Sequence, residues 1–176
     1  VVVNTGVSTS GAVVDERLSG QMSALLMYGL RDAIQRRCSG WQEEGRSVSI
    51  FADELALLVG SSADVVTWLR NQGRSYGVRA TFATQYPEQL PRPVRTVFMS
   101  FDTFVWFAQT NAEVVAEAAA DLSLDGSDWT AADLAGLEPF TAVVRTRLGG
   151  QRLPAVPVKV AFWEGDIASY RADVVS

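Results

Sequence analysis

The chain has 176 residues, 48% apolar and 20% charged, which is enough for one domain with a buried core. It contains no histidine, so Ser–His–Asp catalysis, Cys–His catalysis and His-containing metal sites are excluded. A single cysteine, Cys38, excludes an internal disulfide and a Cys₄ zinc site. The net charge of −5 argues against a freestanding nucleic-acid-binding domain, which usually shows a basic face.

The first third of the chain predicts a strand, a long helix and a second strand. The β-branched run Val1–Val3 is typical of a short strand. Apolar residues then recur every fourth position, which predicts an amphipathic helix over residues 16–38 that ends before Gly40. The repeating positions are Met22, Leu26, Leu30 and Ile34. The apolar run Val48–Ala52 predicts a buried strand, and two acids follow it directly.

The middle third predicts a helix, a strand and a loop. Ser61 and Asp64 have the spacing of a capping box, which predicts a helix that Gly73 and Gly77 terminate. Residues 78–84 form another apolar run and predict a strand. Three prolines at positions 87, 91 and 93 predict a loop with at most a short helical turn.

The last third predicts a strand at residues 103–108 and two capped helices. Asn111 precedes an alanine-rich helix that runs to about Leu122, and Thr130 begins a shorter one. Two further runs, at 140–147 and 156–162, predict a terminal antiparallel strand pair around two adjacent glycines.

Strands that alternate with helices predict parallel β-α-β units, because a helix supplies the crossover between parallel neighbours. The strands are continuous apolar runs, which is typical of strands covered on both faces. We therefore expect an α/β fold: a three-layer sandwich with a mainly parallel sheet and a terminal antiparallel pair. No stretch reaches the roughly 18–20 apolar residues that span a bilayer, and no signal peptide is visible.

Polar residues follow two of the predicted strands. Asp53 and Glu54 come directly after the first, and Gln85 follows the second. In a parallel sheet these side chains meet at the carboxyl edge, where α/β proteins bind ligands. Two alternatives remain: a strand end with two solvated acids, and a Gln85 that only satisfies the backbone of a turn.

Three segments together resemble the FtsK–HerA superfamily of P-loop ATPases, above all its HerA-like, TraG/TraD-like and type IV secretion members. They are S-I-F-A-D-E at 49–54, W-L-R-N-Q-G-R-S-Y-G at 68–77 and G-V-R-A-T-F-A-T-Q-Y-P at 77–87. The order of the downstream elements also matches, so the resemblance covers most of residues 1–165. It implies a partial RecA-like fold for 1–165, with 166–176 as a C-terminal tail.

The resemblance also implies roles for individual residues. Asp53 would hold Mg²⁺ through water, Glu54 would be the general base and Gln85 a polar sensor. Arg70 and Arg74 would be candidates for an arginine finger that acts between subunits. The sequence does not decide between these two and Arg95. The alternative for these arginines is a solvated helix end that favours cations.

The chain departs from the family pattern in one important way, because it contains no G-x-x-x-x-G-K-[ST] loop to bind phosphates. The family also tends to carry an Asn before the third core strand, where this chain has Ser100-Phe101-Asp102. We therefore expect a C-terminal part of a motor ATPase that binds ATP and Mg²⁺ only in its longer parent and is inactive alone.

The same resemblance implies that the parent translocates DNA or protein, as a homo-oligomer. A hexameric ring would need only pore loops to touch DNA, and Arg92 and Arg95 are the candidates here. The expected location is cytoplasmic, with an upstream membrane anchor left open. Two alternatives stand beside this: a non-catalytic α/β interaction domain and a degenerate ATPase relative. A two-carboxylate hydrolase or nuclease is disfavoured, because Glu43 and Glu44 lie in a loop before the strand and do not add to the acids at its end.

Overall fold

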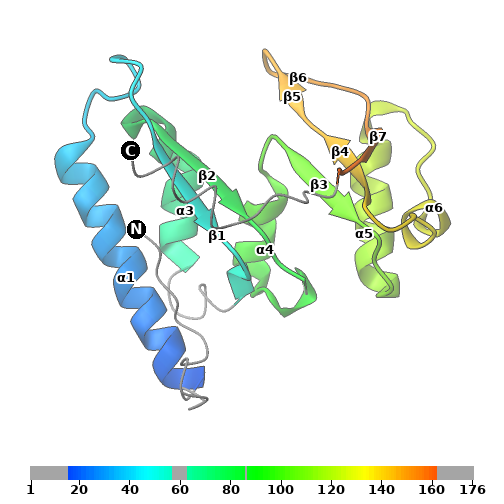
Figure 1. Ribbon diagram of the computed structural model, residues 1–176, viewed down its shortest axis with the longest axis horizontal. Coiled ribbons are helices and arrows are strands. Elements are labelled where there is room, and N and C mark those ends of the chain that lie inside the picture. Colours follow the sequence, from blue (N-terminus) through cyan, green and yellow to red (C-terminus); the bar gives the residue numbers. More distant parts are fainter. Residues whose placement is uncertain (1–15, 57–62, 86, 162–176) are drawn as a thin grey trace. The chain divides into compact units, whose positions relative to one another are not determined.

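The computed structural model of the chain describes residues 16–56, 63–85 and 87–161 (Figure 1). It divides into two compact units, Val1–Phe101 and Asp102–Ser176. The strand expected at Val1–Val3, the Ser61 end of the capping box and the tail at 166–176 lie outside the described residues.

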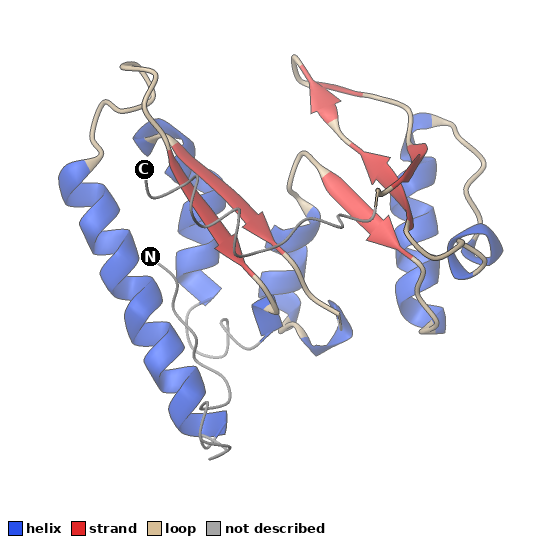
Figure 2. Ribbon diagram, viewed as in Figure 1, coloured by secondary structure: helices blue, strands red, loops and turns tan. Residues whose placement is uncertain are grey.

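A parallel pair of strands forms the centre of the first unit. Strand β1 (Val48–Ala52) pairs with β2 (Val78–Phe82) in a register that runs from Val48↔Val78 to Ala52↔Phe82. Helix α3 (Ala63–Asn71) and the 3₁₀ helix η1 (Gly73–Tyr76) lie between them in the chain (Figure 1). Figure 2 shows the two strands side by side, with helices next to them. This is the β-α-β unit that the alternating apolar runs predict, and both strands are confirmed.

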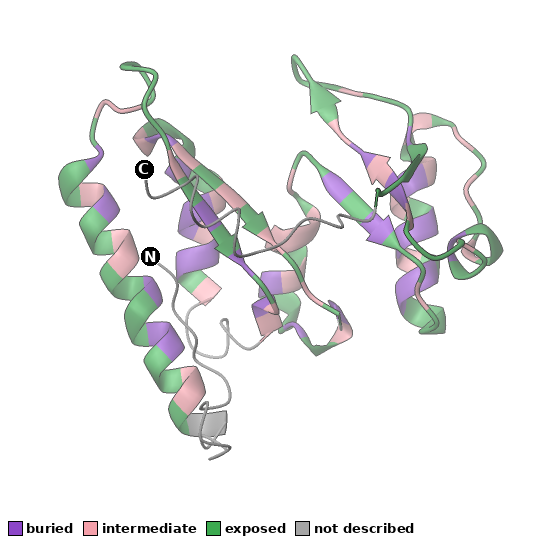
Figure 3. Ribbon diagram, viewed as in Figure 1, coloured by how far each residue is buried: buried purple, intermediate pink, exposed green. Residues whose placement is uncertain are grey.

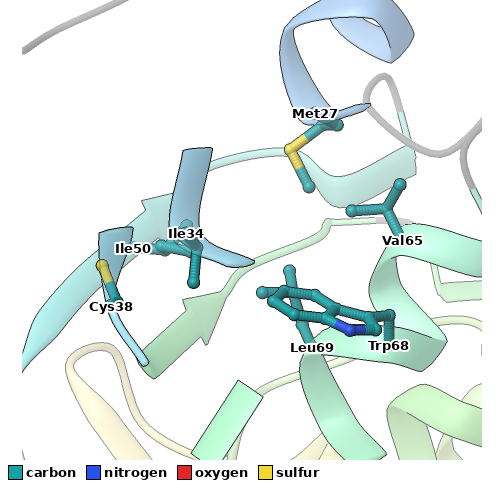
Figure 4. Close-up of a cluster of buried hydrophobic side chains, with 7 residues drawn as sticks. All are labelled: Met27, Ile34, Cys38, Ile50, Val65, Trp68 and Leu69. Carbon is teal, nitrogen blue, oxygen red and sulfur yellow. The ribbon is translucent and has the colours of Figure 1, made fainter. Parts of the chain in front are cut away.

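Helices α1 and α3 bury their apolar sides against the core-facing residues of β1 and β2. Helix α1 (Glu16–Arg37) has nearly the predicted length, and Cys38 follows it in the core. Figure 4 shows the shared cluster, whose burial from water stabilises the unit. Its buried members are Met27, Ile34, Cys38, Ile50, Val65, Trp68 and Leu69. No helix among the described residues combines the length and apolarity required to cross a membrane.

Among the described residues, helices cover one face of the strand pair and not the other. Burial changes along strand β1 (Figure 3). Ile50 and Ala52 are buried in the core, whereas Phe51 between them is 79% exposed. An apolar run was expected to be covered on both faces, but in the described residues the three-layer arrangement is absent. The described part of this unit has two layers: the strand pair and the helices on one side of it.

The proline-rich segment folds differently from the prediction. A 3₁₀ turn, η2 (Pro87–Gln89), leads into helix α4 (Arg92–Met99), so the expected loop with at most a short turn is wrong. Proline is compatible with the first turn of a helix, where its missing N–H has no intrahelical partner. Leu90 and Val94 then bury against Leu55 and Val66, which holds α4 in place.

The second unit is an antiparallel sheet with helices on one face. Its strands β3 (Phe104–Phe107), β4 (Thr141–Arg145) and β7 (Val156–Lys159) lie in the order β3-β4-β7. Two short strands, β5 (Arg147–Leu148) and β6 (Gln151–Arg152), flank the glycine turn. The terminal antiparallel strands are confirmed, whereas a mainly parallel sheet is not: β1–β2 is the single parallel pairing among the described residues, and the fold is mixed α/β.

Two helices of the second unit begin at the predicted caps. Helix α5 (Ala112–Leu122) starts after Asn111, whose side chain accepts hydrogen bonds from the N–H groups of Glu113 and Val114. Helix α6 (Ala131–Ala135) starts with a reciprocal capping box between Thr130 and Asp133. These side chains satisfy N–H groups that the first turn of a helix leaves unpaired.

A buried ion pair links α5 to the sheet. Arg145 on β4 is only 2% exposed, and its Nε donates to Oδ2 of Asp121 at 2.9 Å. Arg152 approaches the other carboxylate oxygen at 3.3 Å. The Arg145 guanidinium also lies 4.7 Å from the centre of the Phe104 ring. Burial lowers the pKa of Arg145, and the Asp121 carboxylate opposes this shift.

Candidate functional site

The carboxyl ends of β1 and β2 remain joined beyond the strands themselves. The N–H of Ala83 donates to the carbonyl of Ala52 at 2.9 Å, and the N–H of Leu55 donates to the carbonyl of Ala83 at 2.7 Å. These two bonds continue the parallel ladder around Asp53 and Glu54. They hold the backbone of the segment that carries Asp53 and Glu54.

Glu54 is the best-held side chain of this edge. Its carboxylate accepts a hydrogen bond from Thr84 Oγ1 at 2.8 Å and from the N–H of Gln85 at 3.3 Å. The residue has φ +52°, a left-handed conformation that costs about 1–2 kcal/mol for a residue other than glycine. The structure therefore places the Glu54 carboxylate beside Thr84 and Gln85, which follow β2. The sequence predicted that Glu54 and Gln85 would lie at the same edge of the sheet.

The contact with Gln85 is made by its backbone, and the Gln85 side chain is exposed. Thr84 supplies the side-chain contact instead, and the sequence analysis assigned it no role. Its position immediately before Gln85, in the same segment that follows β2, was the available signal. The roles of Glu54 and Gln85 in chemistry remain predictions.

Asp53 lies beside Glu54 and is exposed. One of its oxygens, Oδ1, accepts a hydrogen bond from the N–H of Glu54 at 3.1 Å. The described residues contain no group of three or more His, Cys, Asp or Glu side chains that could hold a metal ion. One exposed carboxylate fits Mg²⁺, which keeps several waters and is bound through one or two carboxylates plus phosphates.

Arg70 does not lie at this edge as a free cation. Its Nε and Nη2 both donate to the carbonyl of Ser100, at 3.2 and 2.9 Å, and its guanidinium lies 5.8 Å from the centre of the Phe101 ring. Ser100 is the C-cap of α4, where a cation is favourable. Arg70 therefore fastens α3 to the end of α4.

Arg74 lies at the opposite end of the strands. It belongs to η1, is exposed, and lines a pocket with the residues that precede β1 and begin β2. Five strand residues at about 3.3 Å each put this end roughly 16 Å from the acids. Within one chain the structure brings neither Arg70 nor Arg74 to Asp53 and Glu54. Arg92 and Arg95 lie on α4, Arg92 exposed and Arg95 partly buried.

The fold that the chain adopts is also found in part of a bacterial conjugative coupling protein. The similar structures are those of TrwB. The chain matches TrwBdeltaN70 in its unbound monoclinic form with a TM-score of 0.54 and 21% identity, over 80% of this chain and 38% of that one. It matches plasmid coupling protein TrwB in complex with ADP and Mg²⁺ with a TM-score of 0.55 and 21% identity, over 82% and 38%.

This likeness confirms the family resemblance at the level of the fold. No protein-family model matches the chain, and neither does any curated protein. The chain spans about 38% of the length of the TrwB structures.

Proposed function

We propose that the chain is the Walker B and sensor part of an ATP-hydrolysing motor of the coupling-protein type, which moves DNA or protein. The observation that carries this proposal is Glu54 just beyond the carboxyl ends of β1 and β2: its carboxylate accepts hydrogen bonds from Thr84 and Gln85, and its backbone is left-handed. Residues with a strained backbone cluster at functional sites. In α/β proteins, ligands bind at the carboxyl edge of the sheet. The fold shared with TrwB, one of whose structures contains ADP and Mg²⁺, supports the same reading.

In this proposal the two acids have different tasks. Asp53 would hold Mg²⁺, which neutralises charge on the phosphates when bound. Glu54 would orient the attacking water and accept its proton at a carboxylate oxygen. Each of its oxygens has a lone pair beyond the bond from Thr84 Oγ1 or the Gln85 N–H, so a water can still donate to it. The exposed amide of Gln85 would sense the terminal phosphate.

The position of Arg74 supports a ring. An arginine at the far end of the strands cannot serve the acids of its own chain, but a neighbouring copy can present it to them. A homo-oligomer, with a hexamer as the expected form, would then complete each site with an arginine finger. DNA would pass through the pore, with Arg92 and Arg95 as candidate contacts.

The motor would also need a phosphate-binding loop, which this chain lacks. We propose that a separate segment of a longer, cytoplasmic protein supplies it. That segment would also complete the three-layer RecA-like sheet and cover the face on which Phe51 is exposed.

The test is Glu54→Gln in a protein that contains this chain together with a Walker A lysine. We expect nucleotide binding to persist, while ATP turnover falls at least about 100-fold because the proton acceptor is lost. Glu138→Gln is the matched control, since Glu138 is exposed and distant in sequence from the edge. Turnover that is unchanged in Glu54→Gln would refute the general-base role and favour a non-catalytic interaction domain.

A further inference from the structure

A pocket of about 290 Å³ lies at the amino ends of β1 and β2, the end opposite Asp53 and Glu54. It is formed by the loop before β1 and by the segment that runs from η1 into β2. Three of its lining residues are arginines: Arg46, Arg74 and Arg79. No acid among the residues that the structure describes lines it.

Gly77 explains why the two segments meet there. It has φ +72°, and a Cβ at this position would lie 2.5 Å from the carbonyl oxygen of Arg46. The carbonyl of Gly77 in turn accepts a hydrogen bond from the N–H of Val48 at 3.0 Å. The close backbone approach that only glycine permits therefore sets Arg46 beside the segment that carries Arg74 and Arg79.

The pocket has an excess of positive charge. Arg74 and Arg79 are exposed, and neither forms an ion pair with any residue that the structure describes. Arg46 lies 3.9 Å from the centre of the Trp41 ring, and its Nη1 is 3.3 Å from Glu44 Oε2. Of the three lining arginines, Arg46 alone is paired with a carboxylate in the part of the chain that the structure describes, although the net charge of the whole chain is −5.

The charged hydrogen-bond donors of the pocket are its arginine side chains, and the lining residues Gln42 and Ser47 add a neutral amide and a hydroxyl. The N–H groups of Gly45, Arg46 and Gly77 already donate to the carbonyls of Gln42, Trp41 and Arg74. Guanidinium groups present a planar fork of donors that matches the oxygens of phosphate. The volume suits one or two phosphate groups better than a whole nucleotide, since ligand pockets usually measure about 300–1,000 Å³.

We propose that this pocket binds a phosphate group, with Arg46, Arg74 and Arg79 as its donors. The site needs only the described residues of one chain, and it does not require that the chain take part in hydrolysis. It shares Arg74 with the arginine finger of the proposed function, but phosphate binding by the chain alone can be measured whether or not Arg74 acts in hydrolysis. The phosphate belongs either to a nucleotide or to a nucleic-acid backbone, which present the same oxygens.

The test is isothermal titration of the full 176-residue chain with sodium pyrophosphate at low salt. We expect a dissociation constant of about 0.1–1 mM, the range of a few charge-assisted hydrogen bonds. Arg79→Gln should weaken binding at least about 5-fold, and Arg46→Gln with Arg79→Gln should abolish it. Arg36→Gln is the matched control, because it removes the same charge from a residue already paired with Asp32.

Competition experiments distinguish a nucleotide from a nucleic-acid backbone as the source of the bound phosphate. Displacement of pyrophosphate by ATP alone assigns the site to a nucleotide, and displacement by a single-stranded oligonucleotide assigns it to a nucleic-acid backbone. Either result supports the site. The proposal is overturned if the wild-type chain binds no pyrophosphate, or if Arg36→Gln weakens binding as much as Arg79→Gln does. Circular dichroism of each variant verifies that the fold is retained, and the single variant Arg46→Gln replaces the double variant if the latter unfolds.

Discussion

Glu54 and Asp121 are carboxylates held by several partners, but their partners differ in kind. Neutral donors hold Glu54, namely a hydroxyl and a backbone N–H at the edge of the parallel pair. Two arginines hold Asp121, one of them only 2% exposed, between α5 and the antiparallel sheet.

The difference separates an acid whose charge the fold neutralises from an acid whose charge remains. An acid neutralised by buried cations stabilises the fold and has no remaining charge to offer a substrate. An acid positioned by neutral donors keeps its negative charge and a fixed orientation, which are the properties a general base needs. The following changes test this distinction, starting with the largest expected effect.

Asp121→Asn should destabilise the second unit strongly. The change leaves the buried Arg145 guanidinium without its counter-charge, and breaking such a pair costs about 3–5 kcal/mol. Urea unfolding followed by tryptophan fluorescence measures the loss. Asp32→Asn, which removes an exposed ion pair with Arg36, should change the free energy of unfolding by less than about 1 kcal/mol.

A paired replacement sharpens this prediction. Asp121→Leu combined with Arg145→Met removes both charges, so most of the lost stability should return. If Asp121→Asn costs no more than the exposed control, Asp121 does not act as the counter-charge of a buried arginine, and the contrast with Glu54 fails.

Thr84→Val should have a smaller effect, about 1 kcal/mol, because it removes one hydrogen bond from a partly buried carboxylate. Thr84→Ser retains the hydroxyl and should restore most of the loss. In the longer protein, Thr84→Val should also lower turnover by loosening Glu54. Equal stability in the valine and serine variants would show that the hydroxyl does not hold the acid.

The smallest expected effect on stability is that of Asp125. Like Glu54, this carboxylate accepts hydrogen bonds from a hydroxyl and a backbone N–H. Hydrogen bonds from the Ser127 side chain and N–H lower its pKa below the usual 3.8. The stability that Asp125 contributes is therefore present above pH 3.8 and is lost as the pH falls through its lowered pKa. Ser127→Ala should raise the pKa of Asp125 toward 3.8 in a carbon-13 NMR titration. A pKa that stays unchanged would show that the hydroxyl has no such effect.

Much of the fold could be predicted from the sequence. Apolar periodicity located α1, cap and glycine signals located α3, and continuous apolar runs located β1 and β2, because these patterns follow from helix and strand geometry. Strand pairing was not predicted as well, since β3 was expected to join a parallel sheet. Its alternation of buried and exposed residues is that of an antiparallel strand with one covered face, and sequence alone did not reveal its partner.

The site was predictable for the same reason as the strands. The parallel register of β1 and β2 follows from the β-α-β pattern, and it places Glu54 beside Thr84 and Gln85. The contacts of arginines were not predictable. Arg70 donates to the carbonyl of Ser100 at the end of α4, a helix that was not predicted because of the prolines at its start. Arg145 pairs with Asp121, which is 24 positions away. Such contacts depend on tertiary packing rather than on local pattern.

The left-handed backbone of Glu54 has a consequence for mutational tolerance. Glycine and asparagine fit this conformation with less strain, so a randomised library selected only for folded protein should become enriched in them at position 54. A library selected for ATP turnover should instead retain glutamate. If the two selections prefer different residues at position 54, the glutamate side chain is kept for chemistry although it strains the backbone.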